Sequence, residues 1–321
     1  MPTTRRRLVL SSLLSPLAAA AAPYAADGPA RMRPLAARGV LLDIALAGSR
    51  LVAVGERGHV LLSDDQGKAW RQARAVPTRS TLTALHATDE RQLWATGHGG
   101  LILKSADAGE TWTVATGKAD GPDVLLAIRV QPDGLGLAVG GFGIALATAD
   151  GGRSWQGTTL VDGEAGERHL NRIVVTAAGS WLIAAEGGLV LRGSGSAGAL
   201  KWEAVKTPYA GSLWTGTLLP GGSALLGGMR GNLVSSADDG RSWTHRPVPE
   251  AGSLTGCTTL ADGRPLLVGV DGTVVVGDAG GSSFRLQRLD DRATLTAVTR
   301  LPGGALVATG MAGPRLLETP T

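Results

Sequence analysis

Histidine, cysteine and tyrosine are the residues of this chain best suited to metal binding or nucleophilic chemistry, and they are scattered along it. The five histidines show no paired spacing such as His-x-x-x-His and have no cysteine partner, so the sequence predicts no metal site and no cofactor. His59 and His98 occupy similar places in neighbouring repeats, which leaves a surface metal site as an alternative. Cys257, the single cysteine, lies in an apolar strand pattern and is expected to be buried.

Carboxylates suggest a second chemistry, the hydrolysis of a glycosidic bond. Such enzymes normally place two carboxyl groups roughly 5–10 Å apart. Glu56, Glu186 and Asp271 are the candidates, with Tyr209 as a conceivable nucleophile. No G-x-S-x-G elbow, phosphate loop or dinucleotide fingerprint accompanies them. Whether these carboxylates can meet depends on the elements that carry them.

A ladder of glycines divides the chain into seven units. The glycines lie 41 to 45 residues apart, at positions 58, 100, 143, 188, 231, 272 and 313. A second glycine precedes each of them by three residues except in the fourth unit, where Ala185 takes its place. A leucine lies 18 residues before each of the last six, and the first unit uses Leu41. Repeats of this length are typical of β-propellers.

Each unit contains four short apolar or β-branched runs that are separated by turn signals. The predicted fold is therefore an all-β, seven-bladed propeller with four-stranded blades. The seventh unit supplies only three runs before the sequence ends. We expect an N-terminal strand around residues 30–37 to close that last blade as its fourth strand.

The third gap of several units carries the motif Ser/Thr-x-Asp-x-Gly-x-Ser/Thr-Trp, known as the Asp box. It is complete at 105–112, 148–155 and 236–243, departs only by Ala69 at 63–70, and has decayed copies ending at Trp202 and Phe284. Aspartate can accept hydrogen bonds from turn N–H groups, and tryptophan can be buried between adjacent sheets. These residues are therefore predicted to be structural and not catalytic: Asp65, Trp70, Asp107, Trp112, Asp150, Trp155, Asp238 and Trp243.

We call the face where the first strand of each blade begins the top face; the Asp-box turns then lie on the bottom face. The seven Gly-x-x-Gly turns lie on top, and the residues inside them vary while the glycines recur. A rigid scaffold with varied loop residues is typical of a recognition surface. Solvated turns without a partner are the alternative. The candidate binding residues on or near this face are Asp43, Arg57, His59, His98, Phe142, Arg172, Glu186, Trp214, Arg230 and Asp271.

The N-terminus resembles an export signal, with three arginines at 5–7, an apolar stretch at 8–17 and small residues at 18–26. Both a Sec and a twin-arginine signal fit this pattern. We therefore expect residues 1–26 to be a cleaved signal peptide and 27–321 to be the propeller. Cleavage would remove three arginines and no acid and leave 28 basic against 27 acidic residues, which argues against nucleic-acid binding. No other apolar run is long enough to span a membrane.

The Asp box is shared with bacterial sialidases, so a sialidase-like glycosidase or a lectin is the alternative function. Sialidases have six blades, an arginine triad and a Tyr–Glu pair, none of which this sequence matches. The stretches 52–70, 94–112 and 138–155 resemble the photosystem II stability/assembly-factor family and its bacterial relatives, and the resemblance covers nearly all of 27–321.

That resemblance implies a non-catalytic, exported scaffold, periplasmic or in the thylakoid lumen. It implies a membrane-protein complex or assembly intermediate as the partner, bound by a monomer that does not itself span the membrane. Arg57, Arg172 and Arg230 are candidates for a basic patch by position alone. The resemblance does not tell whether the host is photosynthetic.

Overall fold

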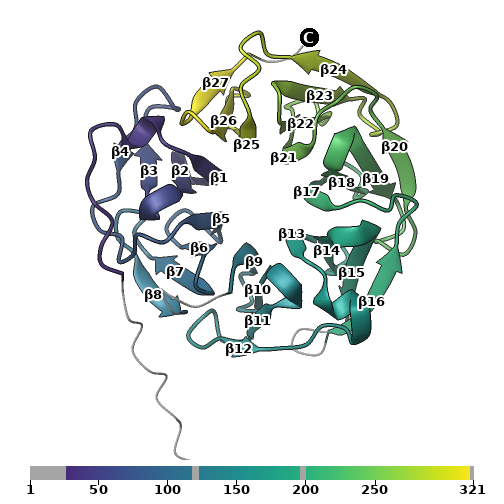
Figure 1. Ribbon diagram of the computed structural model, residues 1–321, viewed down its shortest axis with the longest axis horizontal. Coiled ribbons are helices and arrows are strands. Elements are labelled where there is room, and N and C mark those ends of the chain that lie inside the picture. Colours follow the sequence, from purple (N-terminus) through teal and green to yellow (C-terminus); the bar gives the residue numbers. More distant parts are fainter. Residues whose placement is uncertain (1–26, 118–122, 196–199, 319–321) are drawn as a thin grey trace, which may run out of the picture.

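A computed structural model describes residues 27–117, 123–195 and 200–318. Seven antiparallel sheets are arranged as a ring around a central axis (Figure 1). In each sheet the strands follow one another in chain order from the axis outward. The predicted seven-bladed all-β propeller is thus confirmed. The expected signal peptide, residues 1–26, lies outside the described residues.

The first four blades have four strands each. Blade 1 contains β1 (Leu41–Ala47), β2 (Arg50–Gly55), β3 (Val60–Ser63) and β4 (Arg71–Gln72). Blade 2 contains β5 (Leu82–Ala87), β6 (Leu93–Gly97), β7 (Leu101–Ser105) and β8 (Thr113–Thr116). Blade 3 contains β9 (Leu125–Val130), β10 (Gly136–Gly140), β11 (Ala145–Thr148) and β12 (Gln156–Gly157). Blade 4 contains β13 (Leu170–Val175), β14 (Trp181–Ala185), β15 (Leu189–Ser194) and β16 (Lys201–Lys206).

The remaining three blades complete the ring. Blade 5 contains β17 (Leu213–Leu218), β18 (Ala224–Gly228), β19 (Asn232–Ser236) and β20 (Thr244–Pro247). Blade 6 contains β21 (Leu254–Thr259), β22 (Pro265–Gly269), β23 (Thr273–Gly277) and β24 (Phe284–Arg288). Blade 7 contains β25 (Leu295–Arg300), β26 (Leu306–Gly310) and β27 (Arg315–Leu317).

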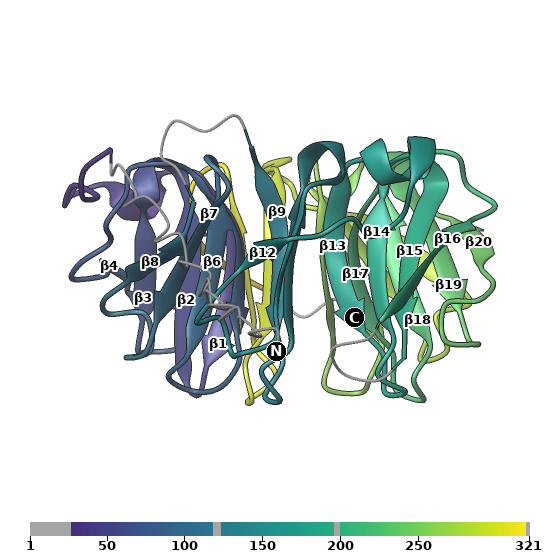
Figure 2. The same cartoon turned by 90° about the horizontal axis from the view of Figure 1, so that it is seen from below.

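Short 3₁₀ turns are the only helical elements of the described residues. Four of them lie between second and third strands: η2 (Glu56–Gly58), η3 (Gly141–Gly143), η5 (Glu186–Gly188) and η6 (Met229–Gly231). The others are η1 (Ala36–Arg38) before β1 and η4 (Gly163–Glu167) before β13. Figure 2 shows these turns along one edge of the ring, which is the top face. No helix among the described residues is long and apolar enough to cross a membrane.

The segment that precedes β1 does not pair with blade 7, contrary to the expectation for residues 30–37. Among the described residues the sheet of blade 7 has three strands. The Ala30 N–H donates to the Val76 carbonyl, and the Arg33 N–H donates to the Gln72 side chain, so the segment lies on blade 1. Pro29 and Pro34 have no N–H to offer to a ladder, which disfavours a strand here.

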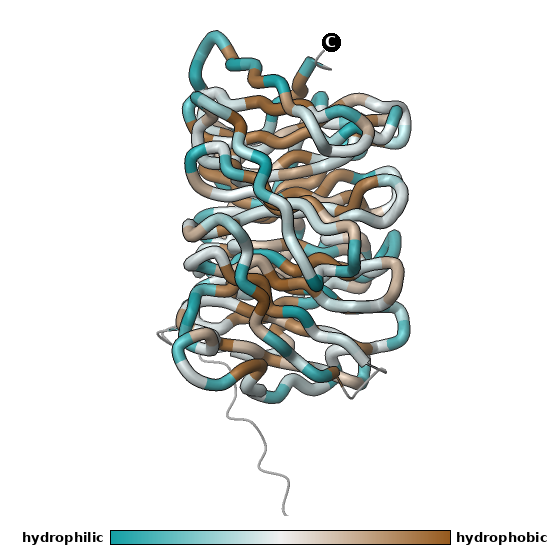
Figure 3. Tube along the Cα trace, turned by 90° about the vertical axis from the view of Figure 1, so that its right-hand side faces the viewer, coloured by the Kyte–Doolittle hydropathy of each residue, from teal (hydrophilic) through white to brown (hydrophobic). Residues whose placement is uncertain are grey.

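The apolar core lies between neighbouring sheets. Figure 3 shows hydrophobic stretches running through the stacked strands, with hydrophilic residues gathered at the turns. Trp112 of blade 2, for example, packs in one cluster with Val52, Val60 and Leu62 of blade 1. Because every sheet packs both faces against its neighbours, the second strand of each blade is almost wholly buried, whereas the innermost strand is partly exposed towards the axis.

Hydrogen bonds around the inner rim join blades in sequence. A side chain next to the leading leucine donates to the backbone carbonyl of the next blade's leading leucine. These bonds run from Thr83 to Leu125, from Asn171 to Leu213 (2.9 Å), from Thr255 to Leu295 (2.7 Å) and from Thr296 to Leu41 (2.6 Å). The last bond joins blade 7 to blade 1 and closes the ring without an N-terminal strand.

The Asp-box turns bond internally on the bottom face. Asp107 accepts hydrogen bonds from the Ser105 hydroxyl (2.9 Å) and from the N–H and hydroxyl of Thr111 (2.9 and 2.6 Å). The Trp112 indole donates to the Gly109 carbonyl. Asp65, Asp150 and Asp238 are each bonded in the same way within their own turns. Their carboxylates are therefore occupied by the turn itself.

Candidate functional site

The top-face turns hold residues in a backbone conformation that favours glycine. Arg57, Phe142, Arg230 and Asp271 all adopt the left-handed region, with φ between 52° and 57°. Blades 2 and 4 carry Gly99 and Gly187 at the same place, with φ of 79° and 70°. A side chain there costs roughly 1 kcal/mol. Four turns therefore keep a side chain where glycine would be easier to accommodate, and strain of this kind is often retained for function.

Single exposed apolar side chains occur on this face and on the segment before β1. Phe142 is 81% exposed at the tip of its turn, and Met311 in the corresponding turn of blade 7 is 56% exposed. Leu35, next to η1, is 64% exposed. The Phe142 ring leans on His169 of blade 4, with 4.6 Å between ring centroids. Exposed large apolar residues of this kind mark interaction surfaces when they cluster.

The charges on this face differ in how far they are neutralised. Asp271 is paired with Arg288 at 2.7 Å and with Arg292 at 3.2 Å. Glu186 accepts from His169 at 3.4 Å. Arg230 forms no ion pair within the part of the chain that the structure describes. Arg57 approaches only Glu56, at 3.8 Å, and its side chain is 71% exposed. Among these turn residues, Arg230 is therefore the cation without an ion-pair partner in the described part of the chain.

Three of the predicted binding residues do not project from the top surface. His59 is buried, because it follows the left-handed Gly58 and begins the path into β3; burial also lowers its pKa. Asp43 is buried at the inner rim, and Trp214 lines a cavity near the axis. His98 is exposed on the top face. With His59 buried, these two histidines do not form the surface metal site considered above.

Asp43 and Arg172 form an ion pair near the ring axis. β1 and β13 lie on opposite sides of that axis (Figure 1), and the Arg172 Nη1 atom reaches within 3.4 Å of the Asp43 Oδ2 atom. The backbone N–H groups of Ile44 and Leu85 also donate to the Asp43 carboxylate, both at 2.9 Å. A cavity of about 100 Å³ borders this pair. The two charges thus satisfy one another, which favours a structural role over ligand contact.

Burial shifts the pKa values of other titratable groups near the axis towards their uncharged forms. Burial lowers the pKa of His86 to about 4, and its Nε2 atom lies 3.0 Å from the Val130 carbonyl oxygen. Burial raises the pKa of the Cys257 thiol to about 12, so this cysteine is a poor nucleophile. Burial and the nearby Arg172 lower the pKa of Arg129.

The candidate catalytic carboxylates lie far apart in the ring. Glu56, Glu186 and Asp271 belong to blades 1, 4 and 6, so at least one whole blade separates any two of them. Packed sheets are about 10 Å apart, which places these groups beyond the spacing a glycosidase uses. The Tyr209 hydroxyl donates to the Met229 carbonyl and its ring stacks on His245. Within the described residues, no three His, Cys, Asp or Glu side chains form a metal site.

Two features of the top face were missed by the sequence reasoning. Leu35 and Met32 are exposed on a segment that was expected to be a strand. His169 contacts both Phe142 and Glu186, and so joins the turns of blades 3 and 4. The ladder spacing alone could have placed His169 next to the leading Leu170, but not its contact with a neighbouring turn.

Comparison with known proteins shows the fold but no family. No family model and no curated protein matches the sequence. Among solved structures, YCF48 bound to D1 peptide is 15% identical, covers 91% of this chain and 96% of its own, and has a TM-score of 0.70. YCF48 from Cyanidioschyzon merolae is 16% identical over 90% of this chain and 98% of its own, with a TM-score of 0.66.

The same fold also occurs in an enzyme. A streptogramin B lyase is 11% identical, covers 89% of this chain and 96% of its own, and has a TM-score of 0.74. One neighbour is thus bound to a peptide and another is a lyase, so the fold serves both binding and catalysis. At these identities the likeness shows the seven-bladed propeller alone, and function must be argued from the residues of the face itself.

Proposed function

We propose that this protein is a non-catalytic, exported scaffold that binds a segment of a membrane-protein complex through its top face. The observation that carries the proposal is the set of strained turn tips that present Arg57, Phe142 and Arg230 to solvent. Aromatic and arginine side chains are among the residues that most often dominate the binding energy of protein interfaces. The YCF48 structure bound to a D1 peptide supports peptide binding as a use of this fold.

The partner's contact surface should be apolar and acidic. Phe142, Met311 and Leu35 offer apolar contacts. Arg230 offers a positive charge without an ion pair in the described residues, and Arg57 has only a long one, 3.8 Å to Glu56. The expected location is the periplasm or a thylakoid lumen, where a monomer would meet the exported parts of membrane proteins. This location rests on the signal-like N-terminus.

Purification of the tagged protein from native membranes, followed by mass spectrometry, tests this proposal. A membrane protein recovered in constant ratio, and lost at high salt because arginines contribute to binding, is the expected result. Recovery of the tagged protein alone would count against a scaffold.

The alternative, a glycosidase or lectin, is tested separately with a panel of sialosides and other glycosides. The separation of Glu56, Glu186 and Asp271 predicts no hydrolysis. Hydrolysis that disappears in Glu186→Gln would overturn the proposal in favour of an enzyme.

A further inference from the structure

An aromatic residue at the start of the fourth strand recurs in six blades. Each of these side chains packs against the preceding blade of the ring, as part of the cluster between the two sheets. They are Trp70, Trp112, Trp155, Trp202, Trp243 and Phe284. The aromatic is thus a regular part of the contact between one blade and the next.

The wall that receives this aromatic is also regular. It includes two residues of the preceding blade. One lies three positions before the glycine that ends the second strand (Ala185 in blade 4), and the other lies two positions after the glycine of the ladder. In blade 1 these are Val52 and Val60, which share a cluster with Trp112. The same two positions receive an aromatic in blades 2 to 5: Trp94 and Ile102, Leu137 and Ala145, Leu182 and Val190, and Leu225 and Leu233. In blade 7, Val307 receives Trp70.

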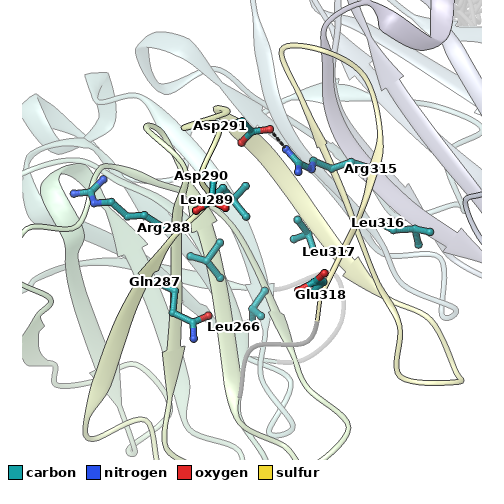
Figure 4. A pocket seen from close by; sticks show the side chains of 11 residues that line it. Leu266, Gln287, Arg288, Leu289, Asp290, Asp291, Arg315, Leu316, Leu317 and Glu318 are labelled. Carbon is teal, nitrogen blue, oxygen red and sulfur yellow. Dashed lines mark hydrogen bonds and ion pairs between the residues drawn. The ribbon is translucent and has the colours of Figure 1, made fainter.

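Blade 6 has the wall but not the aromatic. Its two wall residues, Leu266 and Val274, are buried beneath the partly buried Leu289 and Leu317. The next blade ends at β27 within the described residues. A groove of about 550 Å³ lies at this place, bordered by Leu266, Val274, Leu289 and Leu317. Figure 4 shows this groove between the outer strands of blades 6 and 7. We call it the blade 6–7 groove.

The outer edge of β27 borders the groove. This strand pairs with β26 on one side, and no strand of the described residues pairs with its other side. Leu316 in the middle of β27 is 49% exposed. Unpaired strand edges with an exposed apolar residue readily accept another strand.

The charges of the groove favour a basic occupant. Arg315 is paired with Asp291 at 2.7 Å, as Figure 4 shows, and Arg288 is paired with Asp271 at 2.7 Å. Among the described residues, Asp290 and Glu318 line the groove and form no ion pair. Both arginines thus have an ion-pair partner within the chain, whereas these two carboxylates have none in the described residues.

We propose that the blade 6–7 groove binds an extended segment of a partner protein, which adds to β27 as the fourth strand of blade 7. The segment places an aromatic side chain over Leu289 and Leu317, which pack on Leu266 and Val274, and a lysine or arginine beside Asp290 and Glu318. Strand addition of this kind gains affinity from backbone hydrogen bonds and specificity from side-chain pockets. The groove lies on the outer rim, so this site is separate from the top face and does not rest on its proposed function.

A peptide from the protein's own blade 1 is a suitable probe, because it already forms a fourth strand with this aromatic. Residues 67–76 (GKAWRQARAV) contain Trp70 with Lys68, Arg71 and Arg74. Fluorescence anisotropy with the full chain should show saturable binding. Replacing Trp70 by alanine in the peptide should weaken binding roughly tenfold to a hundredfold, the effect of losing one buried aromatic. Hydrogen exchange should show added protection at Arg315–Leu317.

Two protein variants locate the site. Asp290→Lys with Glu318→Lys should weaken binding several-fold, whereas Glu90→Lys, an exposed carboxylate on blade 2, should not. Leu317→Trp should fill the groove from within blade 7, abolish peptide binding and raise the melting temperature, which shows that this variant folds.

Several outcomes would overturn the proposal. One is the absence of saturable binding at peptide concentrations up to about 1 mM, where even weak specific binding would be detected. Another is that the peptide with alanine in place of Trp70 binds as tightly as the original. Binding that appears only after residues 1–26 are removed would show that the chain's own N-terminus fills the groove. A dimer that Leu317→Trp dissociates would show that the occupant is a second copy.

Discussion

The turns of the bottom face and those of the top face are both repeated around the ring, but they use their polar groups in opposite ways. Asp107 on the bottom bonds to Ser105 and Thr111 of its own turn. Arg230 on the top has no ion-pair partner in the described residues, and Phe142 is exposed. Turns whose polar groups are satisfied internally stabilise the ring. Turns that leave side chains unsatisfied are free to bind a partner.

Both sets of turns contain residues other than glycine in the left-handed region of backbone conformation. Gln66 and Ala108 have φ of 65° and 56° in the Asp-box turns. The strain on the bottom is therefore matched by the strain on top, and left-handed geometry alone does not identify a site. What differs is the exposed aromatic side chain of Phe142, which has no counterpart at the left-handed positions Gln66 and Ala108.

The largest expected effect is the loss of an Asp-box carboxylate. Asp107→Ala removes three hydrogen bonds and leaves the Thr111 N–H without its acceptor, so we expect the free energy of unfolding to fall by about 3 kcal/mol. Chemical denaturation measures this. Asp271→Ala on the top face should cost less than about 1 kcal/mol, because its ion pairs are exposed. Equal losses would remove the distinction between the faces.

Acid should destabilise the protein by protonating the Asp-box carboxylates of the bottom face. Hydrogen bonds from Ser242 lower the pKa of Asp238 to about 2, and its pKa in the unfolded chain is near 3.9. A lowered pKa gives stability that is present above pH 4 and is lost as the pH falls towards 2. The melting temperature should therefore fall over this range, and less steeply in Asp238→Asn. An unchanged slope in that variant would contradict the assignment.

Ring closure should depend on the bond from Thr296 of blade 7 to Leu41 of blade 1. Thr296→Val keeps the shape of the side chain but loses this 2.6 Å bond and the 3.0 Å bond to the Thr309 hydroxyl of its own blade, so we expect a loss of about 1–2 kcal/mol in unfolding free energy. Thr217→Val is the matched control, because the Thr217 hydroxyl bonds only to the adjacent Leu218 carbonyl, at 3.4 Å. Closure that depends on residues 30–37 would instead leave Thr296→Val as stable as the control.

The smallest effect on stability is expected from the top face. Phe142→Gly and Arg230→Gly relieve left-handed strain, but they also make the unfolded chain more flexible, so stability should stay within about 1 kcal/mol of the parent. Thermal unfolding measures this change. A loss of several kcal/mol in either variant would show that these side chains hold the fold together, and it would weaken their assignment to binding.

The sequence was sufficient to predict the structural features that recur in every blade, but not those that occur only once. The glycine ladder and the leading leucines predicted seven blades, because each position has the same local role in every unit. The path of residues 30–37 depends instead on competition between the edges of blades 1 and 7, and hydrogen bonds to Gln72 and Val76 decide it.

Burial near the axis was equally hard to foresee. His59 was assigned to the surface because it follows a turn, yet its side chain packs inside. The approach of Arg172 to Asp43 joins blades 4 and 1, whose separation in sequence carries no sign of contact. The three runs of the seventh unit, in contrast, were visible in the repeat pattern, and the structure showed the groove that lies beside β27.

The most direct test of the central claim is a comparison of two glycine variants in purification from native membranes. One replaces Arg57, Phe142 and Arg230 on the top face, and the other replaces Gln66 and Ala108 at the corresponding left-handed positions of the bottom face. We predict that the top-face variant folds but recovers no membrane-protein partner, while the bottom-face variant recovers as much as the parent. Equal recovery by both variants would contradict the assignment of binding to the top face.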